Sequence, residues 1–168
     1  MNGKDKQKAR IMDTLSDRLR GDERVVQILD ATRGADPTIV VIAAVVAPAI
    51  VLGNVWAHSI LTAALVGGAA GALGGAIAAA VVPRLWFVLT DRRLLVVNAK
   101  ALPLRASATT VDSPVGGVRI TEKKRGGISA KFELEVPGSS PIGFSAAKAW
   151  YPEADQIKAA LEARPTSA

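Results

Sequence analysis

The segment Thr38–Val82, TIVVIAAVVAPAIVLGNVWAHSILTAALVGGAAGALGGAIAAAVV, contains no Asp, Glu, Lys or Arg, and its only ionisable side chain is His58. A straight helix of this length would reach roughly 68 Å, about twice the ~30 Å hydrocarbon core of a bilayer. Turn formers, polar groups and an interfacial aromatic residue occur together at Gly53–Ser59. We therefore predict two membrane-spanning helices, residues 38–55 and 59–82, that form a hairpin within residues 37–83.

The second predicted span carries small residues at every fourth position. They are Ala63, Gly67, Gly71, Gly75 and Ala79. This spacing places them on one helix face, along which another helix can approach closely. The ridge packs on the first span of the same chain, or it also builds a homo-oligomer; the pattern fits both interpretations.

The distribution of basic residues predicts the orientation of the hairpin. The turn between the spans has no Lys or Arg, whereas Arg33 precedes the first span and Arg84 follows the second. Because cytoplasmic flanks of membrane helices are enriched in Lys and Arg, both termini should be cytoplasmic, and the protein is expected in the cell (inner) membrane. Trp56 and Trp86 are predicted to lie at the outer and inner membrane interfaces.

Composition limits the classes of function. The chain has 168 residues, a formal net charge of +6 and a pI near 10.0, but only 4% aromatic residues and no long basic stripe. These features favour an anionic membrane surface as a partner over nucleic acid. The absence of Cys excludes disulfides and thiolate chemistry, and with a single His it argues against a structural zinc site. We expect no metal and no cofactor.

The sequence shows no arrangement of residues that is typical of catalysis. His58 has no partner nearby in the sequence, and no G-x-S-x-G motif is present. The acidic residues are scattered as solvated charges usually are. We therefore expect no catalytic residues and interpret the protein as a non-enzyme.

The segment before the hairpin contains two expected elements. Within residues 1–22, the apolar positions Ile11, Met12, Leu15 and Leu19 predict an amphipathic helix from about Asp5 to Arg20. It packs on the soluble domain or lies on the membrane surface. Within residues 23–36, the β-branched content of Val25–Ala31 favours a strand over a helix.

The segment after the hairpin, residues 84–164, predicts a small β-domain followed by a tail at 165–168. Strands are expected at Leu85–Thr90, Arg93–Asn98, Leu104–Val111, Gly117–Lys123, Ile128–Val136 and Pro141–Phe144. A helix from Pro152 to about Ala163 carries one apolar stripe. Trp150 is predicted to be its core anchor.

The run Trp86–Val97 resembles the "strand, Leu-Thr-Asp/Asn-x-Arg-Leu, strand" signature of bacterial pleckstrin-homology-like domains, including YokE-like groups, through Thr90, Asp91 and Arg93. Gly21-Asp22-Glu23 is similar to the Gly-x-Glu that opens the first strand of such domains. The resemblance implies a bent barrel of about seven strands with a C-terminal capping helix, the hairpin being inserted after the first strand. It implies no catalytic residues.

Three consecutive cations mark one predicted hairpin tip. Lys123, Lys124 and Arg125 precede Gly126-Gly127. They form a solvated turn, or they contact anionic lipid headgroups or an acidic partner, each contributing up to ~1 kcal/mol near a charged surface.

Two hypotheses for function follow from this organisation. In the first, the protein is a membrane-tethered α+β adaptor whose cytoplasmic barrel binds inner-leaflet lipid headgroups or a protein partner. In the second, it is a structural or accessory subunit of a larger membrane complex that assembles through the glycine-rich hairpin.

Overall fold

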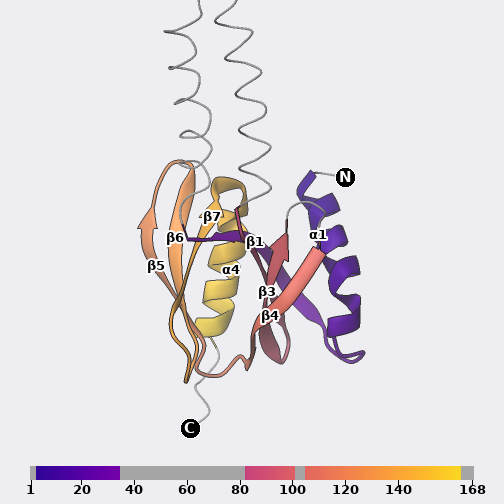
Figure 1. Cartoon of the computed structure of the whole chain (residues 1–168). Helices are drawn as coiled ribbons and strands as arrows, with labels where there is room; N and C mark the ends of the chain where they lie inside the picture. Colours follow the sequence, from indigo (N-terminus) through magenta and orange to yellow (C-terminus); the bar gives the residue numbers. More distant parts are fainter. Residues whose placement is uncertain (1–2, 35–81, 101–104, 164–168) are drawn as a thin grey trace, which may run out of the picture. The chain divides into compact units, whose positions relative to one another are not determined.

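The computed structural model describes residues 3–34, 82–100 and 105–163. These residues form two α-helices, two 3-10 helices and seven strands (Figure 1). In chain order the elements are α1 (Gly3–Leu15), η1 (Ser16–Arg18), β1 (Val25–Arg33), β2 (Arg84–Thr90), β3 (Arg93–Lys100), β4 (Arg105–Pro114), β5 (Arg119–Arg125), β6 (Ser129–Glu135), β7 (Ile142–Ala147), η2 (Lys148–Trp150) and α4 (Tyr151–Glu162).

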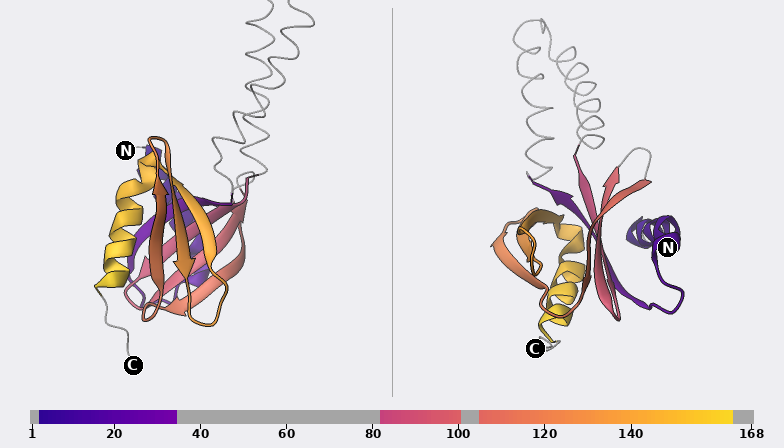
Figure 2. Two further views of the ribbon diagram at one scale, coloured as in Figure 1. Left: turned by 90° about the vertical axis from the view of Figure 1, so that its left-hand side faces the viewer. Right: turned by 60° about the horizontal axis from the view of Figure 1, so that its bottom comes forward.

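The strands that the structure describes pair in one antiparallel, seven-stranded sheet with the order β4-β3-β2-β1-β7-β6-β5. Strand β1 joins the two parts of this sheet, because it pairs with β2 along its length and with β7 through Thr32 and Arg33. The sheet curls so that β5–β7 turn away from β1–β4, as the two views in Figure 2 show. The predicted α+β class is confirmed in the form of a curled half-barrel with helices.

The predicted strand positions agree closely with those observed. Asp91 and Arg92 lie in the turn between β2 and β3, and β1 contains the whole segment Val25–Ala31, for which a strand is favoured over a helix. Two strands end three residues later than predicted: β4 ends at Pro114 and not at Val111, and β7 ends at Ala147 and not at Phe144. The additional residues of β7 remain in the sheet because Ala146 and Ala147 continue the pairing with β6.

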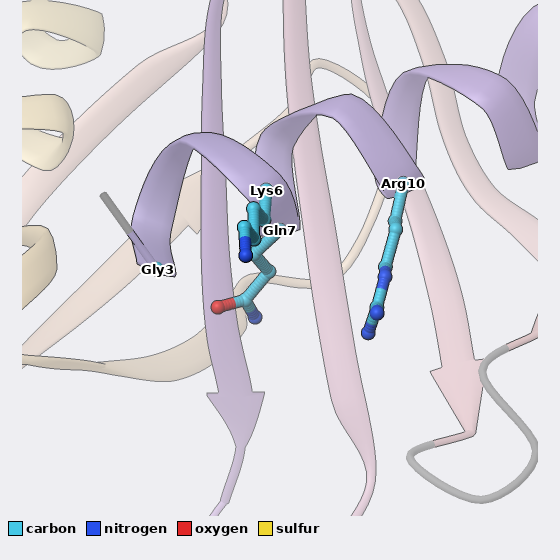
Figure 3. A pocket seen from close by; sticks show the side chains of 4 residues that line it. All are labelled: Gly3, Lys6, Gln7 and Arg10. Carbon is cyan, nitrogen blue, oxygen red and sulfur yellow. The ribbon is translucent and has the colours of Figure 1, made fainter. Parts of the chain in front are cut away.

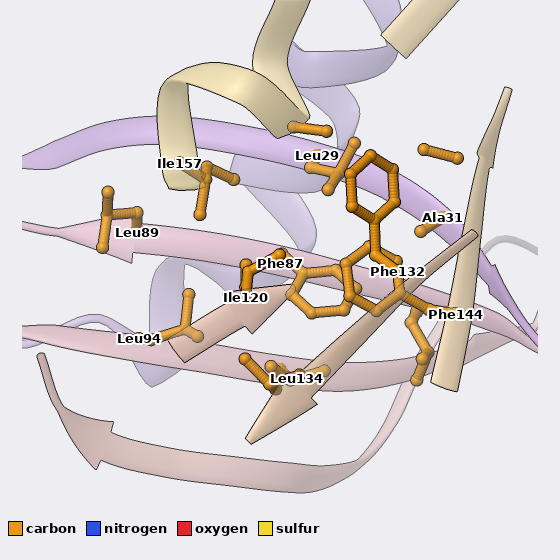
Figure 4. Packing of buried hydrophobic residues seen from close by; sticks show 14 of the residues in the cluster. Leu29, Ala31, Phe87, Leu89, Leu94, Ile120, Phe132, Leu134, Phe144 and Ile157 are labelled. Atoms are coloured by element: carbon orange, nitrogen blue, oxygen red, sulfur yellow. The ribbon is translucent and has the colours of Figure 1, made fainter. Parts of the chain in front are cut away.

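One face of the curled sheet packs against α4 through a cluster of buried apolar side chains, the α4 cluster. At its centre, the ring centroid of Phe144 lies 4.4 Å from that of Phe87 and 5.3 Å from that of Phe132 (Figure 4). The C-terminal side contributes the buried side chains of Trp150, Ala154, Ile157 and Leu161. The predicted apolar stripe and the role of Trp150 as a core anchor are therefore confirmed.

The opposite face of β1–β4 is covered by α1. Ile11 and Leu15 are buried there against side chains of β1, β2 and β3, and Met12 and Leu19 pack at the edge. Of the two alternatives for this segment, packing on the domain is confirmed. The α-helix ends at Leu15, earlier than predicted, and the chain continues into η1.

The structure corrects the prediction for Trp86. This side chain is 0% exposed and lies in the cluster under α1, so its predicted place at the membrane interface is wrong. Successive residues of a strand point to opposite faces of the sheet, and here Phe87 enters the α4 cluster while Trp86 enters the α1 cluster. Strand β2 is buried from Leu85 to Thr90 because both faces of the sheet are covered.

Strands β1 and β2 are neighbours although residues 34–83 separate them in the sequence. Thr32 pairs with Arg84, and the backbone N–H of Arg33 donates to the carbonyl oxygen of Pro83 at 2.9 Å. The chain divides into two compact units, residues 1–34 with 83–168 and residues 35–82. The second unit is thus an insertion between adjacent ends of two paired strands.

Among residues 3–34, 82–100 and 105–163, no helix has the length and apolar character needed to cross a membrane. Apart from Val82, the predicted spans at 38–55 and 59–82 lie outside these residues. The same holds for the predicted packing ridge of Ala63, Gly67, Gly71, Gly75 and Ala79.

Candidate anion-binding surface

The motif residues Thr90 and Asp91 hold the β2–β3 turn and attach the N-terminal segment to it. The hydroxyl of Thr90 donates to the carbonyl oxygen of Arg93 at 3.0 Å and accepts from its N–H at 2.9 Å. Asp91 Oδ1 accepts from the N–H of Arg24 at 3.2 Å, and the N–H of Asp91 donates to the carbonyl oxygen of Arg24 at 2.9 Å. Both residues therefore have structural roles.

Arg93 forms a largely buried ion pair with Glu23. Its Nε and Nη2 donate to the two carboxylate oxygens at 2.8 and 3.0 Å, and its Nη1 donates to Asp112 at 2.6 Å. The Glu23 side chain is 0% exposed and that of Arg93 is 10% exposed. Hydrogen bonding to Glu23 raises the pKa of Arg93. The sequence motifs at 21–23 and 90–93 thus bind each other and fasten β1 to β3.

The predicted tip cations are largely paired with acidic side chains. Lys123 lies 2.5 Å from Glu133, which raises the pKa of Lys123. Arg125 lies 2.5 Å from Asp155 and 2.6 Å from Glu122. The hydrogen bond to Asp155 and, to a smaller extent, that to Glu122 raise the pKa of Arg125. The hydrogen bond from Arg125 lowers the pKa of Glu122.

Lys124 differs from its two neighbours at the tip. Its side chain is exposed and has no ion-pair partner in the described part of the chain. Lipid contact by Lys123, Lys124 and Arg125 remains a prediction, with Lys124 as the cation that carries an uncompensated charge.

The sequence interpretation missed the basic residues of α1, which lie on two faces of the helix. The first face contacts α4. Lys4 and Lys8, one turn apart, both lie 2.9 Å from Glu153 at the start of α4. Their ammonium groups also lie 5.5 and 5.9 Å from the ring centroid of Trp150, within cation–π range. Burial raises the pKa of Glu153, but hydrogen bonds from Lys4 and Lys8 outweigh this effect and lower it. These two lysines join α1 to α4.

Lys6 and Arg10 occupy a different face of the same helix. Together with Gly3 and Gln7 they line a hollow of about 290 Å³. Figure 3 shows the side chains of Lys6, Gln7 and Arg10 extending from one side of α1. Both cations are exposed, and neither forms an ion pair within the described residues. The hollow therefore presents two uncompensated positive charges.

Gln7, which lines the hollow, also bonds to a buried carboxylate. Gln7 Nε2 donates to Asp30 Oδ2, and Arg84 Nη1 donates to the same oxygen at 2.9 Å. Asp30 is only 7% exposed, and burial raises its pKa although Arg84 and Gln7 oppose the effect. Residues from α1, β1 and β2 thus meet beside the end of β2 that adjoins Pro83.

A signal for this surface was present in the sequence. The run Lys4-Asp5-Lys6-Gln7-Lys8-Ala9-Arg10 places a cation at every second position. On a helix, residues four apart share a face, whereas residues two apart point in nearly opposite directions. Lys4 and Lys8 therefore face one side of the helix, and Lys6 and Arg10 face another. An acidic side chain that reaches the first pair does not reach the second.

No group of three or more His, Cys, Asp or Glu side chains suited to a metal ion occurs in the described parts of the chain. Comparisons with protein-family models, with curated proteins and with solved structures found no match for this chain.

Asp30→Asn should raise the free energy of unfolding at pH 7, and the gain should disappear below about pH 4. The folded-state pKa of Asp30 is raised, so its contribution to stability is complete at acid pH and is lost as the pH rises through the folded pKa. Thermal unfolding at pH 7 and pH 3.5 measures the difference. Asp13→Asn, at an exposed carboxylate of α1, is the control; a gain in Asp30→Asn that is equal at both pH values would contradict the assignment.

Proposed function

We propose that the protein is a membrane-anchored, non-enzymatic adaptor. The insertion at 35–82 spans the cell membrane as a helical hairpin, and the half-barrel lies on the cytoplasmic side as a pleckstrin-homology-like module that binds lipid headgroups or a protein partner. The observation that carries the proposal is the position of a long charge-free insertion between adjacent ends of paired strands.

This position constrains the path of the insertion. Gly34 leaves β1 beside the point where Pro83 enters β2, since Arg33 and Pro83 are joined by a backbone hydrogen bond. A segment that leaves and returns at one place crosses a bilayer an even number of times or not at all. The charge-free stretch at 38–82 has the length for two crossings of a ~30 Å hydrocarbon core.

The shape of the half-barrel supports the proposal that it is a pleckstrin-homology-like binding module. Its strand order and its C-terminal helix on the concave side are compatible with a pleckstrin-homology-like domain. The resemblance rests on two motifs, one ending at Glu23 and one containing Arg93. The ion pair between these two residues gives a physical reason for both motifs to occur in one chain.

Replacing residues 34–82 by Asn-Gly should convert a membrane-bound chain into a water-soluble, folded one. A backbone hydrogen bond already joins Arg33 to Pro83 and Thr32 pairs with Arg84, so a short Asn-Gly link can connect the two strand ends. The full chain should stay in the pellet after alkaline carbonate extraction, and the shortened chain should appear in the supernatant. Circular dichroism checks that the strands remain.

Release of the full chain by carbonate would contradict the proposed membrane anchor. A discrete multimer of the full chain in mild detergent that persists after deletion of residues 84–168 would instead favour the accessory subunit built on the hairpin.

A further inference from the structure

We propose that the hollow lined by Lys6, Gln7 and Arg10 binds phosphate groups of anionic lipid headgroups in the membrane that anchors the chain. This inference rests on the proposed function and names the surface by which the domain contacts the bilayer. It assigns that contact to α1 and not to the β5–β6 tip.

The charge pattern of α1 is the first argument. The helix carries four cations, of which Lys4 and Lys8 share the single carboxylate of Glu153. Lys6 and Arg10 are exposed and lack an acidic partner among the described residues. At the tip, by contrast, Lys123 and Arg125 are each paired. Free positive charge is therefore more concentrated in the hollow than at the tip.

The position of the hollow is the second argument. Gln7 binds Asp30, and Asp30 binds Arg84, which follows Pro83 at the return of the insertion. Arg33, the last residue of β1, lies beside Pro83 and is also exposed. The β2–β3 turn lies at the far end of β2, roughly 20 Å away for a strand of this length. Within the domain, the hollow is therefore linked by hydrogen bonds to the strand ends that the insertion connects.

The chemistry of the lining residues is the third argument. An Arg guanidinium donates two parallel hydrogen bonds to phosphate oxygens, and a Lys ammonium adds a point charge. The hollow of about 290 Å³ is only partly enclosed, so a headgroup can enter it from solvent. An anionic leaflet attracts cations near its surface and loses this attraction as salt is added.

The test uses the full chain in vesicles. Ala9→Cys introduces the only thiol of the chain on α1, and this thiol carries a fluorescent label whose quenching by neutral acrylamide is measured. Vesicles are made of phosphatidylcholine alone or with phosphatidylglycerol. The label should be protected in the anionic vesicles, and about 0.5 M salt should remove the protection.

Lys6→Ser with Arg10→Ser should weaken this contact by up to roughly 25-fold, since each cation near an anionic surface contributes about fivefold. Arg20→Ser with Arg119→Ser removes the same charge from exposed positions that lack ion-pair partners in the described part of the chain. Arg20 lies near the β2–β3 turn because Asp22 and Glu23 bind Arg92 and Arg93 there. The control pair should keep the protection.

Equal protection in neutral and anionic vesicles, or equal loss in the two double variants, would overturn the proposal. So would loss of protection on Lys124→Ser alone, which would assign the contact to the tip. Protection by free glycerol phosphate in neutral vesicles would assign the hollow to a soluble phosphate. A chain extracted by carbonate overturns the membrane anchor as well, whereas an embedded chain with an unprotected label overturns only this inference.

Discussion

Trp86→Ala should lower the free energy of unfolding by about 3–5 kcal/mol, the usual cost of truncating a large buried aromatic side chain. Trp86 is 0% exposed and fills the space between β2 and α1, where it packs with Ile11 and Leu15. Its loss leaves a cavity that a helix anchored at both ends fills only in part. Urea unfolding of the full chain in a mild detergent, followed by circular dichroism, measures the change.

Trp86→Phe is the matched control for this variant. It keeps most of the apolar area in the α1 cluster and should cost clearly less than the change to Ala. A tryptophan at a membrane interface would behave differently, because its truncation would change the depth of the protein in the bilayer and leave the domain nearly as stable. A loss below about 1 kcal/mol for Trp86→Ala would therefore contradict the burial of this residue.

The fate of Trp86 illustrates which features the sequence could predict. The turn at Asp91-Arg92 and the alternation in Phe132–Val136 are local signals, and the strands beside them lie where expected. The layer that covers each face of a strand is a tertiary property. The unbroken apolar run in β2 indicated that both faces are buried, but the neighbouring charge-free stretch suggested an interface instead.

The ion-pair partners of the cations could not be predicted from the sequence either, because they are brought together by the tertiary structure. Arg125 meets Asp155 across 30 residues, and Lys4 meets Glu153 across 149 residues. Such partners are brought together by the curl of the sheet and by the placement of α1 and α4. Sequence patterns therefore identify clusters of cations, whereas only the fold determines which of them keep a free charge.

Arg93→Ala should lower the free energy of unfolding by about 3–5 kcal/mol, because it leaves a buried carboxylate without its partner. The side chain of Glu23 is 0% exposed, and Arg93 supplies both of its ion-pair hydrogen bonds. Arg93 also donates to the carbonyl oxygen of Arg18 at 3.0 Å, so its loss should loosen η1 as well. Urea unfolding and hydrogen exchange of residues 16–24 measure the two effects.

Arg92→Ala provides an adjacent control of the same residue type. Arg92 also forms an ion pair, with Asp22 at 2.5 Å, but these side chains are 56% and 61% exposed. Its removal should cost less than about 1 kcal/mol, as is usual for solvated pairs. Replacing Arg93 and Glu23 together by Met should restore much of the stability lost in Arg93→Ala, since the buried charge is then removed with its partner. If Arg93→Ala costs no more than Arg92→Ala, the Glu23–Arg93 pair does not fasten β1 to β3, and the two motifs would need another physical reason to occur together.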